Sequence, residues 1–263
     1  MIQAQNRKHL VRLIQEHVHQ QGWDCDLNHI DVSLVEDFSF LFSIQRPLSQ
    51  SLSKFQGNIS QWDVSRAKNL SHMFEGSDFN GDISNWDVSK VEDMSRMFKN
   101  ACFNQNLSHW NVGNVKQMTD MFWGSAFNQD ISHWNVSQVE SMVRMFARSE
   151  FNQSIESWDV SNVKSMTGMF YGSDFNQPLE HWDVCQVKTM ELMFAHSAFR
   201  QNISGWPLTE DVCLERMFWS SAYAKALGQE DVTWEAYVAL ELEKRFNETW
   251  STSDVRPVVK QRL

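Results

Sequence analysis

Apolar side chains return to the same positions every 24 residues through the middle of the chain. Tryptophan marks this interval most clearly, at Trp62, Trp86, Trp110, Trp134, Trp158, Trp182 and Trp206. Phenylalanine, isoleucine or leucine, and a Met-Phe pair recur between the tryptophans, as at Phe79, Ile83 and Met97–Phe98. A fixed period of this length predicts a solenoid, in which each repeat buries its apolar face against its neighbours.

Two shorter patterns coexist inside each unit. Residues 86–88 place an aspartate between two apolar side chains, which is the alternation of a short strand. Residues 91–101 carry an apolar side chain at every third or fourth position, which is helical spacing, and Ser89 precedes them as a candidate N-cap. We therefore expect an α/β repeat solenoid built from strand-helix units.

The ends of the chain depart from the period. Residues 27–42 repeat the apolar phases weakly, and residues 10–18 form a helical stripe before them. Downstream, Asp231 is a candidate cap for a helix over residues 234–246, and the tail from Ser251 has no period. We expect residues 1–54 to hold a capping helix, a degenerate repeat and a loop, 55–223 to be seven repeats, and 224–263 to be a second helical cap and tail.

The unit resembles the BspA-like bacterial repeat, a relative of the leucine-rich repeat with the pattern F-N-x-x-I-S-x-W-[DN]-V-S-x-V-x-x-M-x-x-M-F. Residues 79–98, FNGDISNWDVSKVEDMSRMF, follow it closely, and the match extends from Phe55 to Phe218. The resemblance implies a leucine-rich-repeat-like fold and a general role in binding. Proteins of that family resemble surface proteins and adhesins.

The charge of the chain is −10, and most of it lies in the repeats. Residues 55–223 contain 20 Asp and Glu against 12 Lys and Arg, a balance of −8. Such a surface repels nucleic acid and anionic membranes and favours a basic protein partner. We expect neither direct nucleic-acid binding nor membrane binding.

Cysteine spacing and the N-terminal residues carry little further signal. Cys25, Cys102, Cys185 and Cys213 lack the spacing of a zinc site or a disulfide framework. Residues 1–9 have neither the apolar stretch nor the cleavage site of a signal peptide. We expect a cytoplasmic protein without a cofactor, either monomeric or in a 1:1 complex, unless a specialised route exports it.

Three histidines share the position before the tryptophan, at His109, His133 and His181. A file of imidazoles suggests a metal site, but two neighbouring histidines without an evident carboxylate or thiolate are an incomplete ligand set. We expect these side chains to point to solvent and to form part of a variable contact surface. Glu156 and Glu180, which replace the usual serine, belong to the same surface.

The position after each tryptophan is Asp or Asn in six units, including Asp159 and Asp183. Both residue types offer an oxygen that accepts a backbone N–H at a turn, so a structural hydrogen bond is the favoured interpretation. We also assign the two aspartates to the partner-binding surface. The asparagines after each phenylalanine, such as Asn104 and Asn128, are expected to form an internal ladder.

Aromatic residues occupy one further position in alternate repeats, at Trp123, Tyr171 and Trp219. A helical wheel places this position about 150° from the buried stripe. These rings are either binding anchors or surface residues that lie flat, with Trp219 covered by the C-terminal helix. The tryptophan and methionine columns, in contrast, are predicted to be core.

No nucleophile motif, phosphate loop or carboxylate pair stands apart from the repeat, so an enzyme is not expected. The leading hypothesis is a cytoplasmic inhibitor or immunity protein that covers the active site of a basic, nuclease-type toxin. The alternative is a surface adhesin or exported effector that binds a host protein or glycan.

Overall fold

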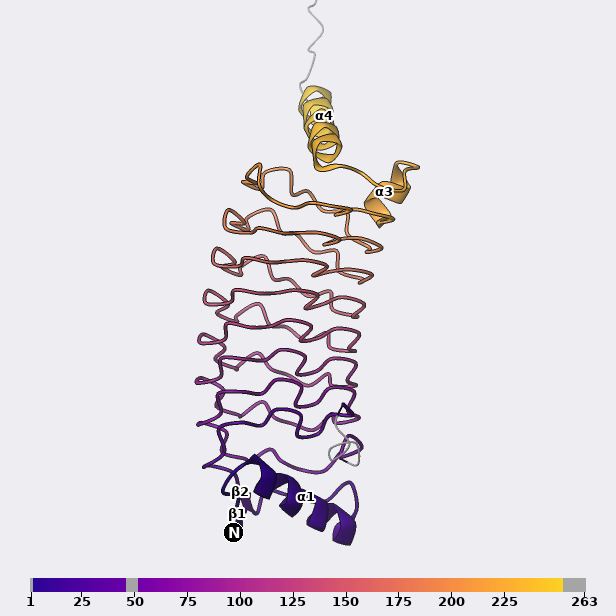
Figure 1. Ribbon diagram of the computed structural model, residues 1–263. Helices are drawn as coiled ribbons and strands as arrows, with labels where there is room; N and C mark the ends of the chain where they lie inside the picture. Colours follow the sequence, from indigo (N-terminus) through magenta and orange to yellow (C-terminus); the bar gives the residue numbers. More distant parts are fainter. Residues whose placement is uncertain (1, 46–51, 253–263) are drawn as a thin grey trace, which may run out of the picture.

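The structure, a computed structural model, describes residues 2–45 and 52–252 (Figure 1). Its regular elements lie near the two ends of the chain: β1 (Ile2–Gln3), α1 (Arg7–Gln21) and β2 (Ile30–Asp31), then α3 (Ala222–Ala226) and α4 (Trp234–Thr252). Between β2 and α3 the chain runs in coils that lie one above another in a column (Figure 1). The chain therefore has a repeat architecture.

Neighbouring coils are joined by a parallel backbone bridge at one equivalent position in each unit. The bridged residues form the series Asp37, Asn69, Asp93, Gln117, Ser141, Ser165, Thr189 and Cys213. Because each residue pairs with the one before it and the one after it, the backbone hydrogen bonds of one coil are satisfied by its neighbours.

The predicted strand-helix unit is wrong. Residues 86–88 form no strand, residues 91–101 form no helix, and Ser89 caps none. Alternate amides point instead at the next coil: the N–H of Met94 donates to the carbonyl oxygen of Gln117 at 3.0 Å and that of Arg96 to Thr119 at 2.9 Å. Intervening amides donate three residues back, as Met97 does to Met94 at 3.1 Å.

Positive φ angles prevent helix formation in this segment. Arg96 has φ of 58° and Asn100 has φ of 54°, and the equivalent residues of the other coils repeat both values closely. A left-handed residue at every fourth position interrupts the right-handed α-helix and closes a tight turn instead. The chain of turns keeps the same apolar spacing as a helix, which explains why the sequence pattern predicts one.

The tryptophan and methionine columns form the core, as predicted. The methionines of these columns are at most 2% exposed, and the seven periodic tryptophans are at most 5% exposed. Each indole N–H donates to the carbonyl oxygen of the isoleucine or leucine in the preceding coil, as Trp86 does to Ile59 at 3.1 Å. The core therefore satisfies its own polar groups while it excludes water.

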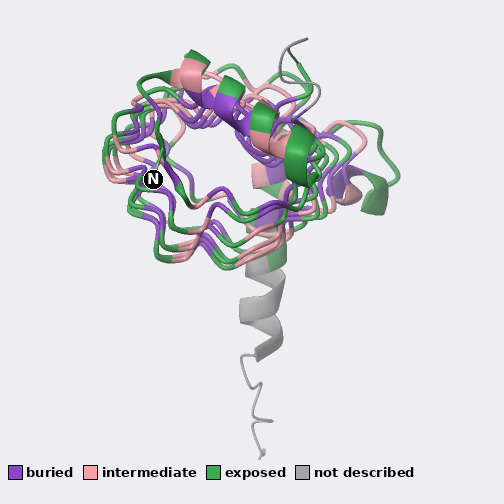
Figure 2. Ribbon diagram, turned by 90° about the horizontal axis from the view of Figure 1, so that it is seen from below, coloured by how far each residue is buried: buried purple, intermediate pink, exposed green. Residues whose placement is uncertain are grey.

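The N-terminal segment covers the first coil. β1 pairs in parallel with β2, with Ile2 opposite Ile30. Asn6 caps α1 by accepting a hydrogen bond from the amide of His9, and α1 lies across the N-terminal end of the column (Figure 2). Its buried residues Leu10, Leu13 and Ile14 continue the core.

Tyr237 of α4 closes the last coil. Its side chain is completely buried, and its hydroxyl accepts a hydrogen bond from the amide of Ile203 at 2.8 Å and donates to the carbonyl oxygen of Gln201 at 3.1 Å. Asp231 does not cap α4 as predicted, since the hydroxyl of Thr233 accepts from Ala236 N–H at 3.4 Å.

The C-terminal helix extends further than the sequence pattern suggests. α4 extends to Thr252, past the predicted start of the tail at Ser251. The side chain of Phe246, the rest of the tail, and part of the predicted loop over 43–54 lie outside the described residues.

Candidate binding surfaces

The segment around each tryptophan forms an acidic face. In six successive coils, residues 58–63, 82–87, 106–111, 130–135, 154–159 and 178–183 contain no lysine or arginine. Their carboxylates are Asp63, Asp82, Asp87, Asp130, Glu156, Asp159, Glu180 and Asp183. We call these residues the acidic face.

The predicted turn hydrogen bond is present in every coil of this face. The carboxylate oxygen of Asp159 accepts the amide of Ser161 at 3.1 Å, and Asn135 makes the same bond to Ser137 at 3.1 Å. Because Asp and Asn act alike here, the oxygen holds the turn, as the sequence suggested. The side chain of Asp183 makes the same bond to Cys185, which stands where other coils have serine.

These hydrogen bonds also change the acidity of the face. The hydroxyl and amide of Ser161 donate to Asp159 and lower the pKa of that carboxyl, and Ser89 does the same for Asp87. The amide and hydroxyl of Ser84 lower the pKa of Asp82. Donors aimed at the ionised form favour it, so these aspartates carry their charge firmly at neutral pH.

Part of the predicted contact surface is brought together on this face. His181 lies exposed beside Glu156 of the preceding coil, with Nε2 3.7 Å from the carboxylate. Asp159 and Asp183 are exposed at equivalent positions of the same two coils, and Glu180 is exposed next to His181.

The other two predicted histidines, His109 and His133, are exposed on the preceding coils of the acidic face. Among the residues that the structure describes, no three His, Cys, Asp or Glu side chains are grouped as a metal would require. The asparagine ladder is also present: the amide of Asn128 donates to Asn104 at 2.9 Å, and the amide of Asn152 donates to Asn128 at 2.9 Å.

The aromatic residues Trp123, Tyr171 and Trp219 lie elsewhere on the coil, in the turns with positive φ. They are half-buried, not fully exposed as a helical wheel suggests. A cation or imidazole separates each ring from the next. The alternating series is Lys99, Trp123, Arg148, Tyr171, His196 and Trp219. We call it the basic-aromatic strip.

The strip is held together by cation–π and edge contacts. The guanidinium of Arg148 lies 5.7 Å from the ring centre of Trp123 and 5.6 Å from that of Tyr171. The ring of His196 lies edge-on between Tyr171 and Trp219, at 5.4 Å and 4.6 Å. Trp219 donates through Nε1 to Glu230, which precedes α4, at 3.2 Å.

Beside this strip lies a cluster that the sequence analysis missed. Asp120 is completely buried, and its carboxylate lies 3.0 Å from Nε of Arg96, 2.7 Å from Nε of Arg144 and 3.7 Å from Nζ of Lys99. Arg96 and Lys99 come from the coil before Asp120, and Arg144 comes from the coil after it. The signal was available, because Asp120 is the one acidic residue at a position that otherwise carries His, Arg, Gly or Leu.

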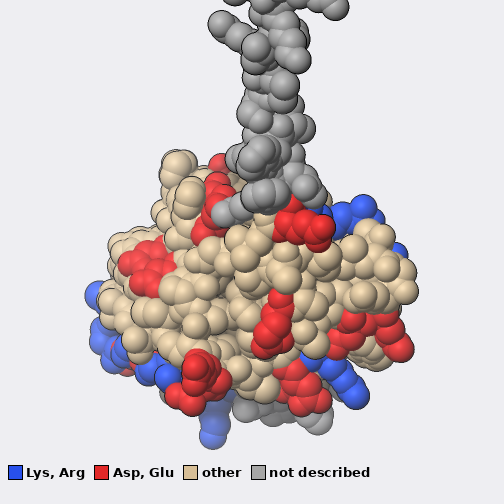
Figure 3. Space-filling view, turned by 90° about the horizontal axis from the view of Figure 1, so that it is seen from above, with Lys and Arg blue, Asp and Glu red and all other residues tan. Residues whose placement is uncertain are grey.

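Charge is thus sorted between different parts of the coil. Figure 3 shows the C-terminal end of the column, where acidic side chains are spread over the surface and lysine and arginine side chains gather toward its edges.

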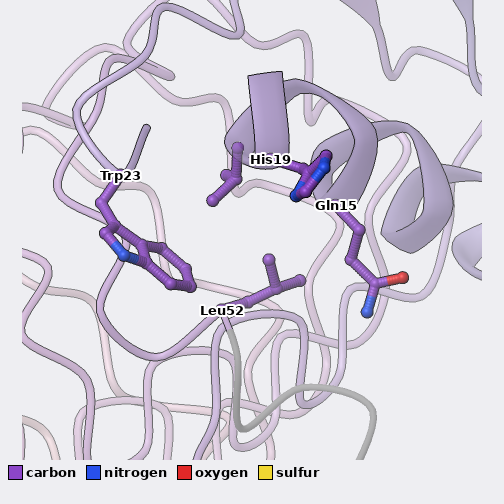
Figure 4. A pocket seen from close by; sticks show the side chains of 5 residues that line it. Gln15, His19, Trp23 and Leu52 are labelled. Carbon is purple, nitrogen blue, oxygen red and sulfur yellow. The ribbon is translucent and has the colours of Figure 1, made fainter. Parts of the chain in front are cut away.

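A hollow lies at the N-terminal end of the column. Gln15, Val18, His19, Trp23 and Leu52 line a space of about 520 Å³ (Figure 4). The indole of Trp23 and the side chain of Leu52 face this space. Among the lining residues that the structure describes, His19 has the one titratable side chain.

Comparison with protein families assigns most of the chain to one of them. Residues 8–125, 46–153 and 124–234 each match the family described as "Mycoplasma protein of unknown function, DUF285". The chain belongs to this family. The three overlapping matches confirm that it is a repeat protein, as the 24-residue period predicts. The comparison with curated proteins and the comparison with solved structures each gave no match.

The family match covers the coils and both candidate surfaces. It extends from α1 to the first residue of α4, so it includes the acidic face, the Asp120 cluster and the basic-aromatic strip. In the part of this chain that the structure describes, no helix has the length and apolar character needed to cross a membrane.

Proposed function

We propose that this repeat protein is a non-catalytic, protein-binding solenoid of the leucine-rich-repeat-like, BspA-like kind. The observation that carries the proposal is the acidic face, on which eight carboxylates occur without a lysine or arginine. Carboxylates in register along a rigid column offer a preorganised field for a basic partner, and such a field speeds association.

The partner that fits this field best is a basic toxin of the nuclease type, and the proposed role is that of a cytoplasmic inhibitor or immunity protein. A nuclease must attract phosphates, so its active site is cationic. Glu156, Asp159, Glu180 and Asp183 would cover that site, while His109, His133 and His181 supply variable contacts beside them. Occlusion alone then blocks the substrate, and the inhibitor needs no chemistry of its own.

A charge-reversal experiment tests the acidic face. Glu156→Lys combined with Glu180→Lys is expected to abolish capture of basic proteins from the native host. The matched control is Glu92→Lys combined with Glu140→Lys, which reverses two exposed carboxylates outside the face. Capture should also weaken as salt rises, because exposed charges more than about 8 Å apart are screened at 0.15 M. Equal loss in both double variants, or binding that is indifferent to salt, would refute the role of the face.

The alternative proposal is a surface adhesin or exported effector that binds a host protein or glycan. The resemblance to BspA-like repeats favours it, since those proteins resemble adhesins. Fractionation of the native organism separates the two proposals: the inhibitor stays in the cytoplasm, and the adhesin or effector is found on the surface or in the medium. A toxin gene next to this one would favour the inhibitor.

A further inference from the structure

The basic-aromatic strip and the Asp120 cluster together form a surface opposite in charge to the acidic face. Three cations, Arg96, Lys99 and Arg144, share the single buried carboxylate of Asp120, which leaves an excess of two positive charges. Arg148 adds a third, because no carboxylate pairs with it among the described residues and its recorded contacts are with rings.

The arrangement fixes the cations without neutralising them. Asp120 is 1% exposed at its side chain, whereas Arg96 and Arg144 are 39% and 48% exposed. The buried carboxylate therefore orients the guanidinium groups from below and leaves part of each in contact with solvent. A guanidinium whose position is already set loses less entropy when it binds a carboxylate.

Trp123 and Tyr171 place apolar surface among these charges. Both rings are half-buried, and the guanidinium of Arg148 lies between them. Space for this packing comes from small residues: Ala147 stands in the intervening coil at the position of the two rings, and Gly172 follows Tyr171. A Cβ at Gly172 would lie 3.4 Å from Cγ of Arg148.

A hollow extends the strip toward the N-terminal end. It has a volume of about 470 Å³ and is lined by Phe40, Gln45, His72, Glu75, Arg96 and Lys99. The ring of Phe40 stacks on that of His72 with 4.0 Å between the ring centres. A carboxylate oxygen of Glu75 lies 2.5 Å from Nδ1 of His72. The surface thus offers an apolar wall and two cations at one end, and stacked cations and rings along its length.

We propose that this surface binds an acidic, aromatic-containing segment of a protein partner. Carboxylates of the segment pair with Arg144, Arg148 and Lys99, and its aromatic side chains pack against Trp123 and Tyr171. The choice rests on charge complementarity, because the cations are held fixed and exceed the carboxylates. The site is separate from the acidic face, so the molecule has two docking surfaces of opposite sign.

A fluorescence-anisotropy titration tests this inference with a labelled glutamate–tyrosine copolymer as the probe, at low salt. The wild-type protein is expected to bind the copolymer, and to bind a lysine–tyrosine copolymer through other residues or not at all. Arg148→Glu should weaken binding of the glutamate–tyrosine copolymer by about tenfold or more, because it replaces an attractive charge with a repulsive one. A tenfold change in Kd corresponds to about 1.4 kcal/mol. Tyr171→Ala should weaken it by several-fold through loss of the ring.

Arg66→Glu is the matched control, because Arg66 is 51% exposed and pairs with Glu36 outside the strip. The Arg66→Glu variant should bind the glutamate–tyrosine copolymer as the wild type does. The variant that combines Glu156→Lys with Glu180→Lys changes only the acidic face, so it should also bind the copolymer as the wild type does. Thermal melting of each variant establishes that it folds. If Arg148→Glu unfolds, Arg148→Gln serves as the second variant, with a smaller expected loss.

Three results would overturn the inference. The first is absence of binding at low salt, or equal binding by Arg148→Glu and Arg66→Glu. The second is tighter binding of single-stranded DNA than of the copolymer, which would assign the strip to nucleic acid. The third is self-association of the wild type that both Arg148→Glu and Glu180→Lys abolish, which would make a second copy of this chain the occupant.

Discussion

The indole nitrogen of Trp134 donates a hydrogen bond to the carbonyl oxygen of Leu107 in the preceding coil, at 2.9 Å. Both groups are buried, and the same bond recurs in all seven coils that carry the periodic tryptophan. The tryptophan column therefore does two things: it fills the core, and it ties neighbouring coils together through a carbonyl oxygen that also accepts a backbone amide, as Leu107 does from Trp110 at 3.1 Å.

Trp134→Phe should lower the free energy of unfolding by about 1–3 kcal/mol, because it removes the buried indole hydrogen bond to Leu107 and leaves unfilled space in the core. Trp23→Phe is the matched control, since Trp23 is 36% exposed and lies outside the column. Urea denaturation followed by circular dichroism measures both. A loss of the same size in the two variants would mean that the indole hydrogen bond contributes nothing.

The asparagine ladder makes a second prediction. Asn128 accepts from the amide of Asn152 at 2.9 Å and from Nε2 of Gln153 at 3.0 Å. Asn128→Ala removes this acceptor and should cost about 1–3 kcal/mol of stability, whereas Asn128→Asp keeps an oxygen in place and should cost less. Denaturation of Asn85→Ala, an exposed asparagine outside the ladder, provides the baseline.

A third prediction concerns acid unfolding. Hydrogen bonds from serine lower the pKa of Asp87 and Asp159 in the folded protein, below the value of about 3.9 in an unfolded chain. Their contribution to stability is therefore present above that pH and is lost as the pH falls through the folded pKa. Asp87→Asn with Asp159→Asn keeps the turn hydrogen bond, so it should leave stability at neutral pH nearly unchanged and reduce the loss of stability in acid.

The reverse substitution is the control for this experiment. Asn111 makes the same hydrogen bond, to Gly113 at 3.1 Å, without a charge. Asn111→Asp should make stability depend more steeply on pH below about 4. Melting temperatures measured from pH 7 to strongly acidic solution decide the matter, and parallel curves for all three proteins would contradict the assignment.

The Asp120 cluster makes the fourth prediction. Asp120→Ala removes a buried carboxylate that holds three cations, and it should lower stability by about 1–3 kcal/mol. This loss of stability should be smaller than the loss on breaking a fully buried ion pair, because the arginines that Asp120 holds are partly hydrated. Glu140→Ala, whose exposed carboxylate pairs with Lys164, should cost much less, because solvent screens an exposed ion pair. Equal costs in a denaturation experiment would show that burial of Asp120 adds nothing.

The sequence by itself determined the period, the core and much of the internal hydrogen bonding. Burial of Trp134 and Met94 follows from the period alone, because a side chain that recurs in every coil must meet its own equivalents in the stack. The turn at Asp159 and the ladder through Asn128 were also predictable, since Asp and Asn share only an oxygen that accepts hydrogen bonds.

Only the tertiary structure decided how the backbone runs within a coil and what surrounds the strip. Apolar spacing over residues 91–101 is the same for a helix and for a series of tight turns, and the choice depends on amides that find their acceptors in the next coil. The Asp120 cluster likewise depends on the stack: the sequence marks Asp120 as an exception, but its three cations come from the coils on either side of it. The sequence of one repeat unit contains neither the backbone acceptors of the next coil nor the cations that surround Asp120. Both are supplied by neighbouring coils, and only when the coils stack.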